Sequence, residues 1–292
     1  MHQLTDKEVL VALCRRFGVR PSADAGQNFL VDEAALSATV AAGELSLHDV
    51  ILEVGPGFGT LTQALAPQAG RVVAIEADPT LAAAARELLA SHANVSLHQG
   101  NALRMDWLAL GVPDGFKAIS NLPYGITGRF LRRLLTEMPR PSRAVLMVQR
   151  EVAQRLTASP GKMSVLSVLC QLHADVEIVA SVPRKSFWPV PAVDSAIVRL
   201  RLRSLPELAT LCGDGLESET VLRVCKIGFA SRRKTLANNL RAWADFSSTH
   251  RQGKMSLEEM IRSCDLTPNA RAQELTIPQW ITLAKKVKNY LN

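Results

Sequence analysis

Four consecutive residues, Asn121-Leu122-Pro123-Tyr124, combine an amide, a restricted backbone and an aromatic ring directly after a predicted strand. The Asn121 amide oxygen and the backbone carbonyl of Leu122 or Pro123 can accept hydrogen bonds from the two protons of an exocyclic amine such as adenine N6. Pro123 fixes the backbone and so places the carbonyl in advance. The Tyr124 ring offers a face on which a base can stack. The set predicts chemistry on an aromatic amine; a plain proline turn is the alternative.

The chemistry explains this choice of residues. Adenine N6 is a weak nucleophile because its lone pair is delocalised into the ring. Two accepted hydrogen bonds favour a tetrahedral nitrogen and free the lone pair for in-line attack on a sulfonium methyl group. Such a reaction depends on positioning and hydrogen-bond acceptance rather than on a strong base.

A glycine-rich loop, Glu53-Val-Gly55-Pro-Gly57-Phe-Gly59, lies between an apolar strand pattern and a helical pattern. Glycines allow a sharp turn and a close approach of a ligand to the main chain. The spacing G-x-G-x-G differs from the NAD fingerprint, and no Walker lysine follows. Glu76 ends the next predicted strand, where a carboxylate can accept hydrogen bonds from both ribose hydroxyls of an adenosine cofactor. The pattern predicts a nucleoside-containing cofactor, with a tight turn as the alternative.

These residues lie within an alternation of strand and helix patterns. The early strands are short, apolar and β-branched, which is typical of strands covered on both faces. Strands are predicted at residues 50–54, 71–76, 95–99, 117–121 and 144–148, and helices at 4–17, 32–43, 61–66, 79–91, 127–137 and 150–158. The alternation predicts an α/β, Rossmann-like fold with a parallel, doubly wound sheet. Extended segments at 176–182 and 196–202 are expected to form an antiparallel edge pair.

The pattern changes after residue 203. Residues 204–218 contain Pro206, Gly213 and Gly215 and are predicted to be a linker with little order, and the chain from 220 onward is helical in pattern. Residues 203–292 hold 14 Lys and Arg against 9 Asp and Glu, a net charge of +5, whereas the rest of the chain carries 20 against 18, or +2. We therefore predict two domains, 1–203 and a smaller, basic, helical domain at 204–292.

Composition narrows the class of protein. The net charge of +7 favours a polyanionic partner such as nucleic acid, although charge alone does not exclude a merely basic enzyme. The five cysteines are scattered and form no C-x-x-C pair, which predicts reduced thiols and no zinc site. The chain shows neither a secretory signal pattern nor an apolar stretch of about 20 residues, so we expect a cytoplasmic protein without a membrane partner.

Five motifs appear in order along the chain. They are Gln27-Asn28-Phe29-Leu30, the glycine loop, Asn121-Leu-Pro-Tyr124, Phe187-Trp-Pro-Val-Pro191-Ala-Val-Asp194-Ser195 and Gly228-Phe-Ala-Ser-Arg232-Arg233-Lys234-Thr-Leu-Ala-Asn-Asn239-Leu. Together they resemble the small-subunit rRNA adenine N6-dimethyltransferases, the KsgA family. The resemblance runs from about Phe17 to the C-terminus. It implies a class I S-adenosylmethionine-dependent methyltransferase domain followed by a small all-helical rRNA-binding domain.

The resemblance also implies a site. S-adenosylmethionine would be the methyl donor, without a metal, and the cofactor residues would be Gln27, Asn28, Leu30, Gly55, Gly57, Glu76, Ala77, Asn101, Ala102 and Asn121. The catalytic residues would be Asn121, Pro123, Tyr124 and Phe187, with Phe187 stacking on the flipped adenine opposite Tyr124. Asn101 stands where the family usually has Asp, which accepts from the cofactor's adenine amine. We expect weakened rather than abolished cofactor binding from this difference.

The substrate implied by the resemblance is a pair of adjacent adenines in the 3′-terminal hairpin loop of small-subunit rRNA. They would be dimethylated by a monomer on a partly assembled ribosomal subunit. Arg232, Arg233 and Lys234, expected in a helical pattern, would contact RNA phosphates, although a charge run alone is as often a solvated face.

Two rival functions stay open on the sequence. One is the related large-subunit rRNA adenine methyltransferase group that confers macrolide resistance, which shares the cofactor and similar Asn-Leu-Pro-Tyr motifs. The Arg232-Arg233-Lys234-Thr-Leu segment favours the small-subunit enzyme. The other is a non-catalytic ribosome-assembly or transcription factor on the same fold, against which the intact Gly55, Glu76 and Asn121 argue.

Overall fold

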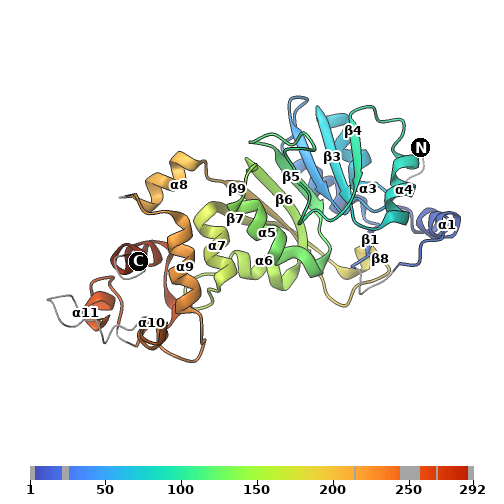
Figure 1. The fold of residues 1–292 in the computed structure, drawn as a ribbon. Coiled ribbons are helices and arrows are strands. Elements are labelled where there is room, and N and C mark those ends of the chain that lie inside the picture. Colours follow the sequence, from blue (N-terminus) through green and yellow to red (C-terminus); the bar gives the residue numbers. More distant parts are fainter. Residues whose placement is uncertain (1–3, 22–25, 214, 244–256, 268, 289–292) are drawn as a thin grey trace. The chain divides into compact units, whose positions relative to one another are not determined.

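The computed structural model describes residues 4–21, 26–213, 215–243, 257–267 and 269–288 (Figure 1). By packing, the chain divides into two compact units. The first is Met1–Ala153 with Val176–Leu202, and the second is Gln154–Asp175 with Arg203–Asn292. The sequence-based division at residue 203 assigned 154–175 to the first domain. The packing groups this segment with the second unit because α7 (Val165–His173) contacts α9 (Ser218–Gly228) and α12 (Ile277–Val287).

A seven-stranded sheet forms the centre of the first unit, in the order β4-β3-β2-β5-β6-β9-β7. The parallel strands are β2 (Val50–Val54), β3 (Arg71–Glu76), β4 (Val95–Gln99), β5 (Lys117–Asn121) and β6 (Arg143–Gln149). β9 (Ser195–Leu202) runs antiparallel to β6, and β7 (Ala174–Val182) lies beyond it at the edge. The predicted α/β class is confirmed, and the two late extended segments lie next to each other at one side of the sheet as β9 and β7.

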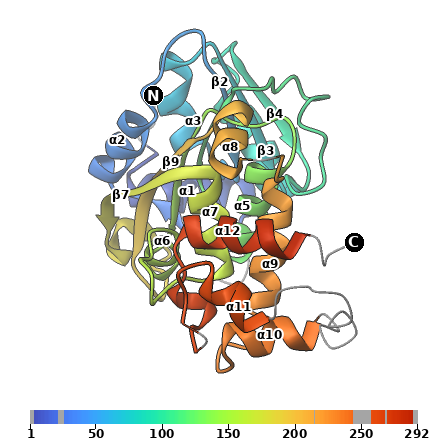
Figure 2. The same ribbon diagram turned by 90° about the vertical axis from the view of Figure 1, so that its left-hand side faces the viewer.

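Both faces of the central strands β2 and β3 are covered, which explains why these strands are apolar without alternation. Ile51 and Leu52 are neighbours on β2 and point to opposite faces, yet both are fully buried; the same holds for Val72 and Val73 on β3. One face packs against α2 (Glu33–Ala42) and α3 (Thr60–Leu65), which contact each other and strands of the sheet (Figure 2).

Aspartates begin several helices of the first unit by accepting hydrogen bonds from backbone N–H groups of the first turn. Asp6 caps α1 (Lys7–Phe17), Asp32 caps α2, and Asp78 caps α4 (Pro79–Leu88). α5 (Thr127–Thr136) instead continues directly from a short 3₁₀ turn, η2 (Tyr124–Ile126), and joins the end of β5 to β6. Another 3₁₀ turn, η1 (Ala66–Gln68), follows α3.

A two-stranded ribbon that the sequence did not predict connects distant segments. β1 (Phe29–Leu30) pairs antiparallel with β8 (Phe187–Trp188), just after η3 (Arg184–Ser186), and sets Leu30 opposite Phe187. The Val31 N–H donates to the Ser186 carbonyl at 2.8 Å, and the Ser186 hydroxyl donates to Asp32 at 2.6 Å. Strands of two residues have no periodicity to detect, so only the tertiary structure reveals the pairing.

The second unit is built around α9, which contacts α7, α8 (Leu205–Cys212), α10 (Leu236–Trp243) and α12. α11 (Leu257–Arg262) contacts α10 and α12, η4 (Ala272–Glu274) precedes α12, and α6 (Arg150–Leu156) spans the division between the units. The linker predicted for 204–218 is wrong over its first half. Ser204 and Glu207 form a reciprocal capping box, and Pro206 lies in the first turn, where no backbone N–H is needed.

All five cysteines are buried free thiols. Within the described residues, no helix is long and apolar enough to cross a membrane.

Candidate functional site

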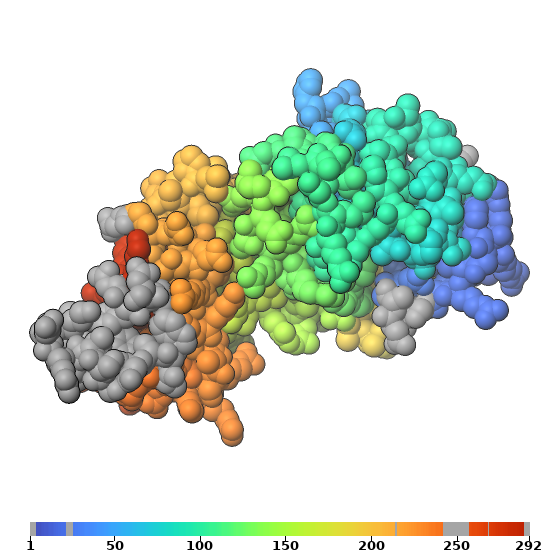
Figure 3. Space-filling view, viewed as in Figure 1, coloured from blue at the N-terminus to red at the C-terminus, as the bar shows by residue number. Residues whose placement is uncertain are grey.

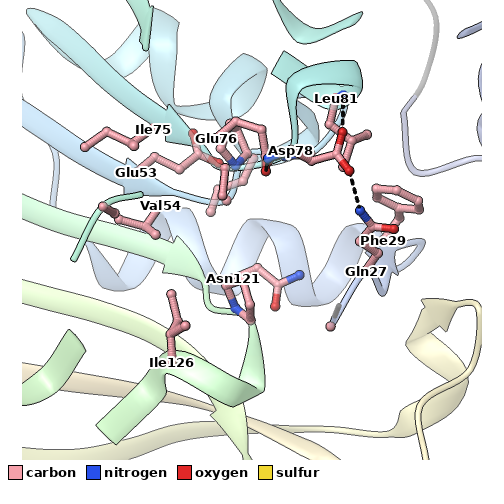
Figure 4. Close-up of a pocket in the computed structure, with 18 of the residues that line it drawn as sticks. Gln27, Phe29, Glu53, Val54, Ile75, Glu76, Asp78, Leu81, Asn121 and Ile126 are labelled. Atoms are coloured by element: carbon pink, nitrogen blue, oxygen red, sulfur yellow. Dashed lines mark hydrogen bonds between the residues drawn. The ribbon is translucent and has the colours of Figure 1, made fainter. Parts of the chain in front are cut away.

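A cavity of about 510 Å³ lies in the first unit, beside the ends of β2, β3 and β5 (Figure 4). Every residue that the sequence predicts to bind the cofactor lines it: Gln27, Asn28, Leu30, Gly55, Gly57, Glu76, Ala77, Asn101, Ala102 and Asn121. In a parallel sheet the carboxyl ends of the strands meet along one edge, which explains why residues from separate segments converge here.

The glycine loop forms one wall of this cavity. Its backbone conformation and its close packing require glycine at two positions. Gly55 and Gly57 have φ values of 72° and 59°, in the left-handed region. A Cβ on Gly57 would lie 3.1 Å from the Phe29 ring, and one on Gly55 would lie 3.3 Å from Pro123. The loop thus packs closely against both the N-terminal segment and the Asn121 segment.

Glu76 holds the loop from the end of β3. One of its carboxylate oxygens accepts from the Gly57 N–H at 3.1 Å, and the other accepts from the Asp78 N–H at 3.0 Å. Burial raises the pKa of Glu76, and these two hydrogen bonds oppose the rise. Each carboxylate oxygen has a second lone pair, so the group can also accept hydrogen bonds from ribose hydroxyls.

Glu53, on β2 below the loop, is a second carboxyl in the cavity wall. It is 1% exposed, and burial, with a further contribution from the charge of Glu76, raises its pKa to about 8. Its Oε2 atom and the Oδ1 atom of Asn28 are buried without a hydrogen-bond partner among the described residues. Buried polar atoms normally have a partner, so these two atoms fit a bound molecule that donates hydrogen bonds. The sequence marks Glu53 as the acid before the loop but assigns it no role.

The N-terminal segment closes the cavity from another side. The Gln27 side-chain amide donates to Asp78 Oδ2 at 3.2 Å, while Asp78 Oδ1 caps α4 (Figure 4). The Asn121 amide nitrogen donates to the Asn28 carbonyl at 3.4 Å. Asp78 was missed in the sequence, although an aspartate before Pro79 is a typical helix start.

Asn121 ends β5 beside Met147 of β6 and faces the cavity from the side opposite Glu53 and Glu76 (Figure 4). Because its amide nitrogen is directed to the Asn28 carbonyl, its oxygen is the atom left to accept from a ligand. Pro123 also lines the cavity, and its own carbonyl accepts from the Ile126 N–H at 3.2 Å.

Two predicted catalytic residues do not line the cavity. The Tyr124 hydroxyl and the Ser195 hydroxyl share a hydrogen bond of 2.8 Å, and burial raises the pKa of Tyr124. Phe187 is 1% exposed and packs with Leu30 in the hydrophobic core. Neither residue is among those that line this cavity, so the stacking of an adenine between Phe187 and Tyr124 stays a prediction. The ribbon to β1 holds the Phe187 side chain inward.

Arg232, Arg233 and Lys234 are exposed in the turn between α9 and α10. The predicted helix through them is wrong. α9 ends at Gly228, where an added Cβ would lie 2.6 Å from the Trp280 ring. The buried Asn239 amide then holds the turn by donating to the Gly228 carbonyl at 2.6 Å and to the Ser231 carbonyl at 3.0 Å.

No group of three or more His, Cys, Asp or Glu side chains in the described part of the chain could hold a metal ion.

Comparison with known proteins adds to this geometry. A family model described as ribosomal RNA adenine dimethylase matches residues 20–288. A ribosomal RNA small subunit methyltransferase A from Pelotomaculum thermopropionicum is 36% identical over 288 residues, covering 94% of both chains. A protein of the same name from Nostoc sp. is 37% identical over 278 residues, covering 91% of this chain and 97% of the relative.

Two solved structures share the fold over most of the chain. A dimethyladenosine transferase from Plasmodium falciparum superposes with a TM-score of 0.74 at 23% identity, covering 89% of this chain and 98% of that one. The 23S rRNA methyltransferase ErmE superposes with a TM-score of 0.68 at 28% identity, covering 89% of this chain and 100% of that one.

Proposed function

The chain belongs to the ribosomal RNA adenine dimethylase family, and from this premise we propose that it methylates adenine N6 in small-subunit rRNA with S-adenosylmethionine as donor. The observation that carries the proposal is the cavity at the strand ends, where the Asn121 amide oxygen faces the same space as the glycine loop and Glu76. The named relatives at 36–37% identity are small-subunit enzymes, which favours this substrate over large-subunit rRNA. Intact site residues favour an enzyme over a non-catalytic assembly factor.

The residues present fit this cofactor. Glu76 would accept from the ribose hydroxyls, and Gly55 and Gly57 would leave room for the ligand along the main chain. The unpartnered oxygens of Asn28 and Glu53 would meet its hydrogen-bond donors. When bound, the cofactor supplies a methyl carbon already activated by a positive sulfur. The proposed transfer therefore needs no metal.

Two acceptors on the chain would activate the amine. The Asn121 oxygen would take one N6 proton in a hydrogen bond. The backbone carbonyl of Leu122 or Pro123 would accept the second proton; the Pro123 carbonyl, which already accepts from the Ile126 N–H, keeps a second lone pair. Pro123 fixes the direction of that carbonyl, so the geometry exists before the substrate arrives. Methylation would leave the nitrogen acidic enough to lose its proton without a strong base.

The finer details of the substrate belong to the same proposal. The targets would be two adjacent adenines in the 3′-terminal hairpin loop, dimethylated on a partly assembled subunit in the cytoplasm. A monomer would suffice, because every predicted cofactor residue in the cavity comes from one chain. Arg232, Arg233 and Lys234 would contact phosphates from their exposed turn.

The test uses purified protein, isotope-labelled S-adenosylmethionine and ribosomal subunits that lack the modification. Mass spectrometry of rRNA fragments is expected to find dimethyladenosine in the small-subunit hairpin only. Asn121→Ala is expected to keep most of its affinity for S-adenosylhomocysteine and to lose at least a hundredfold in rate, about 3 kcal/mol of transition-state stabilisation. Label in large-subunit RNA alone, or full activity in the Asn121 variant, would contradict the proposal.

A further inference from the structure

The loop that follows β4 forms one end of the cavity, where Gly100, Asn101 and Ala102 line it. This loop, residues 100–105, is tightly folded. The Asn101 carbonyl accepts from the N–H groups of Arg104 and Met105, and its side-chain oxygen accepts from the Leu103 N–H at 2.9 Å. Its shape therefore determines where the cavity wall stands.

Arg133 on α5 holds this loop through two backbone carbonyls. One terminal nitrogen of its guanidinium donates to the Ala102 carbonyl at 2.6 Å, and the other donates to the Met105 carbonyl at 2.7 Å. A planar fork with fixed donor directions can satisfy two carbonyls at once, whereas an ammonium is a single point charge. The contact is thus specific to arginine.

A buried indole completes this arrangement. Trp107 is 1% exposed, and its N–H donates to the same Ala102 carbonyl at 3.0 Å. The Arg133 guanidinium lies over the Trp107 ring, 4.1 Å from its centroid, and its Nε is 3.3 Å from a Glu137 oxygen. Only 13% of the Arg133 side chain is exposed. Stacking and low exposure confine the guanidinium to one position.

α5 also carries the opposite side of the site. It begins at Thr127, directly after η2, so its first turn continues the Asn121–Tyr124 segment, while Arg133 lies nearly two turns further on. Figure 3 shows that the teal-to-green part of the chain, which includes α5, reaches the surface of the first unit. The neighbouring Arg132 is exposed, whereas the Arg133 guanidinium donates to the loop.

We propose that Arg133 is a positioning residue for the cofactor: by binding the carbonyls of Ala102 and Met105, it fixes the loop that forms the nucleobase end of the cavity. This inference rests on the proposed function, because it takes the cavity to be the S-adenosylmethionine site. Arg133 itself touches neither the cofactor nor the substrate in this role.

The test is Arg133→Lys, with Arg132→Lys as the matched control on the same helix. Isothermal titration with S-adenosylhomocysteine is expected to give a Kd raised about tenfold for the Arg133 variant and unchanged for the control. The KM for S-adenosylmethionine should rise by the same factor while kcat at saturation stays near the wild-type value. A general loss of structure would instead lower kcat or the fraction of binding-competent protein.

A second variant covers the case in which Arg133→Lys does not fold. Trp107→Phe keeps a ring under the guanidinium and removes one donor to the Ala102 carbonyl, so the Kd should rise about threefold. An unchanged Kd in the folded variants, or a lower kcat at an unchanged Kd, would overturn the inference. Failure of the wild-type chain to bind S-adenosylhomocysteine would instead contradict the proposed function, and the inference with it.

Discussion

The buried carboxyl below the glycine loop should make stability depend on pH over a defined range. Burial raises the pKa of Glu53 from 4.5 to about 8, with the charge of Glu76 contributing less. The folded chain therefore holds a proton that the unfolded chain releases. This stabilisation is complete below pH 4.5 and is lost as the pH rises through about 8.

The size of the effect follows from linkage. One extra proton on the folded chain changes the free energy of unfolding by about 1.4 kcal/mol per pH unit. Between pH 5 and pH 7 the loss is therefore about 2–3 kcal/mol, and across the whole shift it is about 5 kcal/mol. Glu53→Gln keeps the shape of the side chain and removes the titration. The free energy of unfolding of the variant should therefore rise relative to that of the wild type as the pH rises.

Urea unfolding of both proteins at pH 5, 6, 7 and 8 measures this difference. Subtracting the two curves cancels most of the groups that the proteins share. The exposed Glu87, changed to Gln, controls for the loss of a carboxyl elsewhere in the first unit. Parallel curves for wild type and Glu53→Gln would refute the reasoning, because they would mean that Glu53 titrates alike in the folded and unfolded chains.

Three further predictions concern the reaction and its substrate. Ser195→Ala and Tyr124→Phe remove the same 2.8 Å hydrogen bond, so each should lower kcat about fivefold. The double variant should be no slower than either single variant, and additive losses in single-turnover assays would contradict this. Asn101→Asp should lower the Kd for S-adenosylhomocysteine three- to tenfold, as measured by titration calorimetry. One side-chain oxygen at this position already accepts from the Leu103 N–H, and the second oxygen of the aspartate would be a charged acceptor for the ligand. An unchanged or higher Kd would contradict this prediction. Replacing Arg232 and Arg233 with Ala should reduce the salt dependence of subunit binding by about one power of salt per lost phosphate contact; an identical slope would exclude the turn from the interface.

Local sequence was sufficient for the sheet and for the cofactor side of the site. The parallel strands at 50–54, 71–76, 95–99 and 117–121 lie where their sequence patterns predict. In the central strands β2 and β3, which are buried on both faces, nearly every residue is apolar and carries the signal. Since parallel strands end at the same edge, the glycine loop, Glu76 and Asn121 had to converge.

Two predictions in the second unit are wrong because the same residue type can either begin or end a helix, depending on its neighbours. Pro206 favours a linker when it is considered alone, but next to the Ser204–Glu207 capping box it lies in the first turn of a helix. The run of charges after Gly228 has a helical pattern, but α9 ends at Gly228, where the close approach of Trp280 requires glycine.

The sequence by itself determined the fold class and which residues converge on the cavity, because these depend on short-range patterns and on strand order. Only the tertiary structure decided that Phe187 is buried beside Leu30, that Tyr124 is anchored by Ser195 and that Arg133 holds the loop after β4. Each of these contacts joins segments far apart in the chain. Such pairings carry no local pattern, because they form only when packing brings particular donors and acceptors within hydrogen-bond distance.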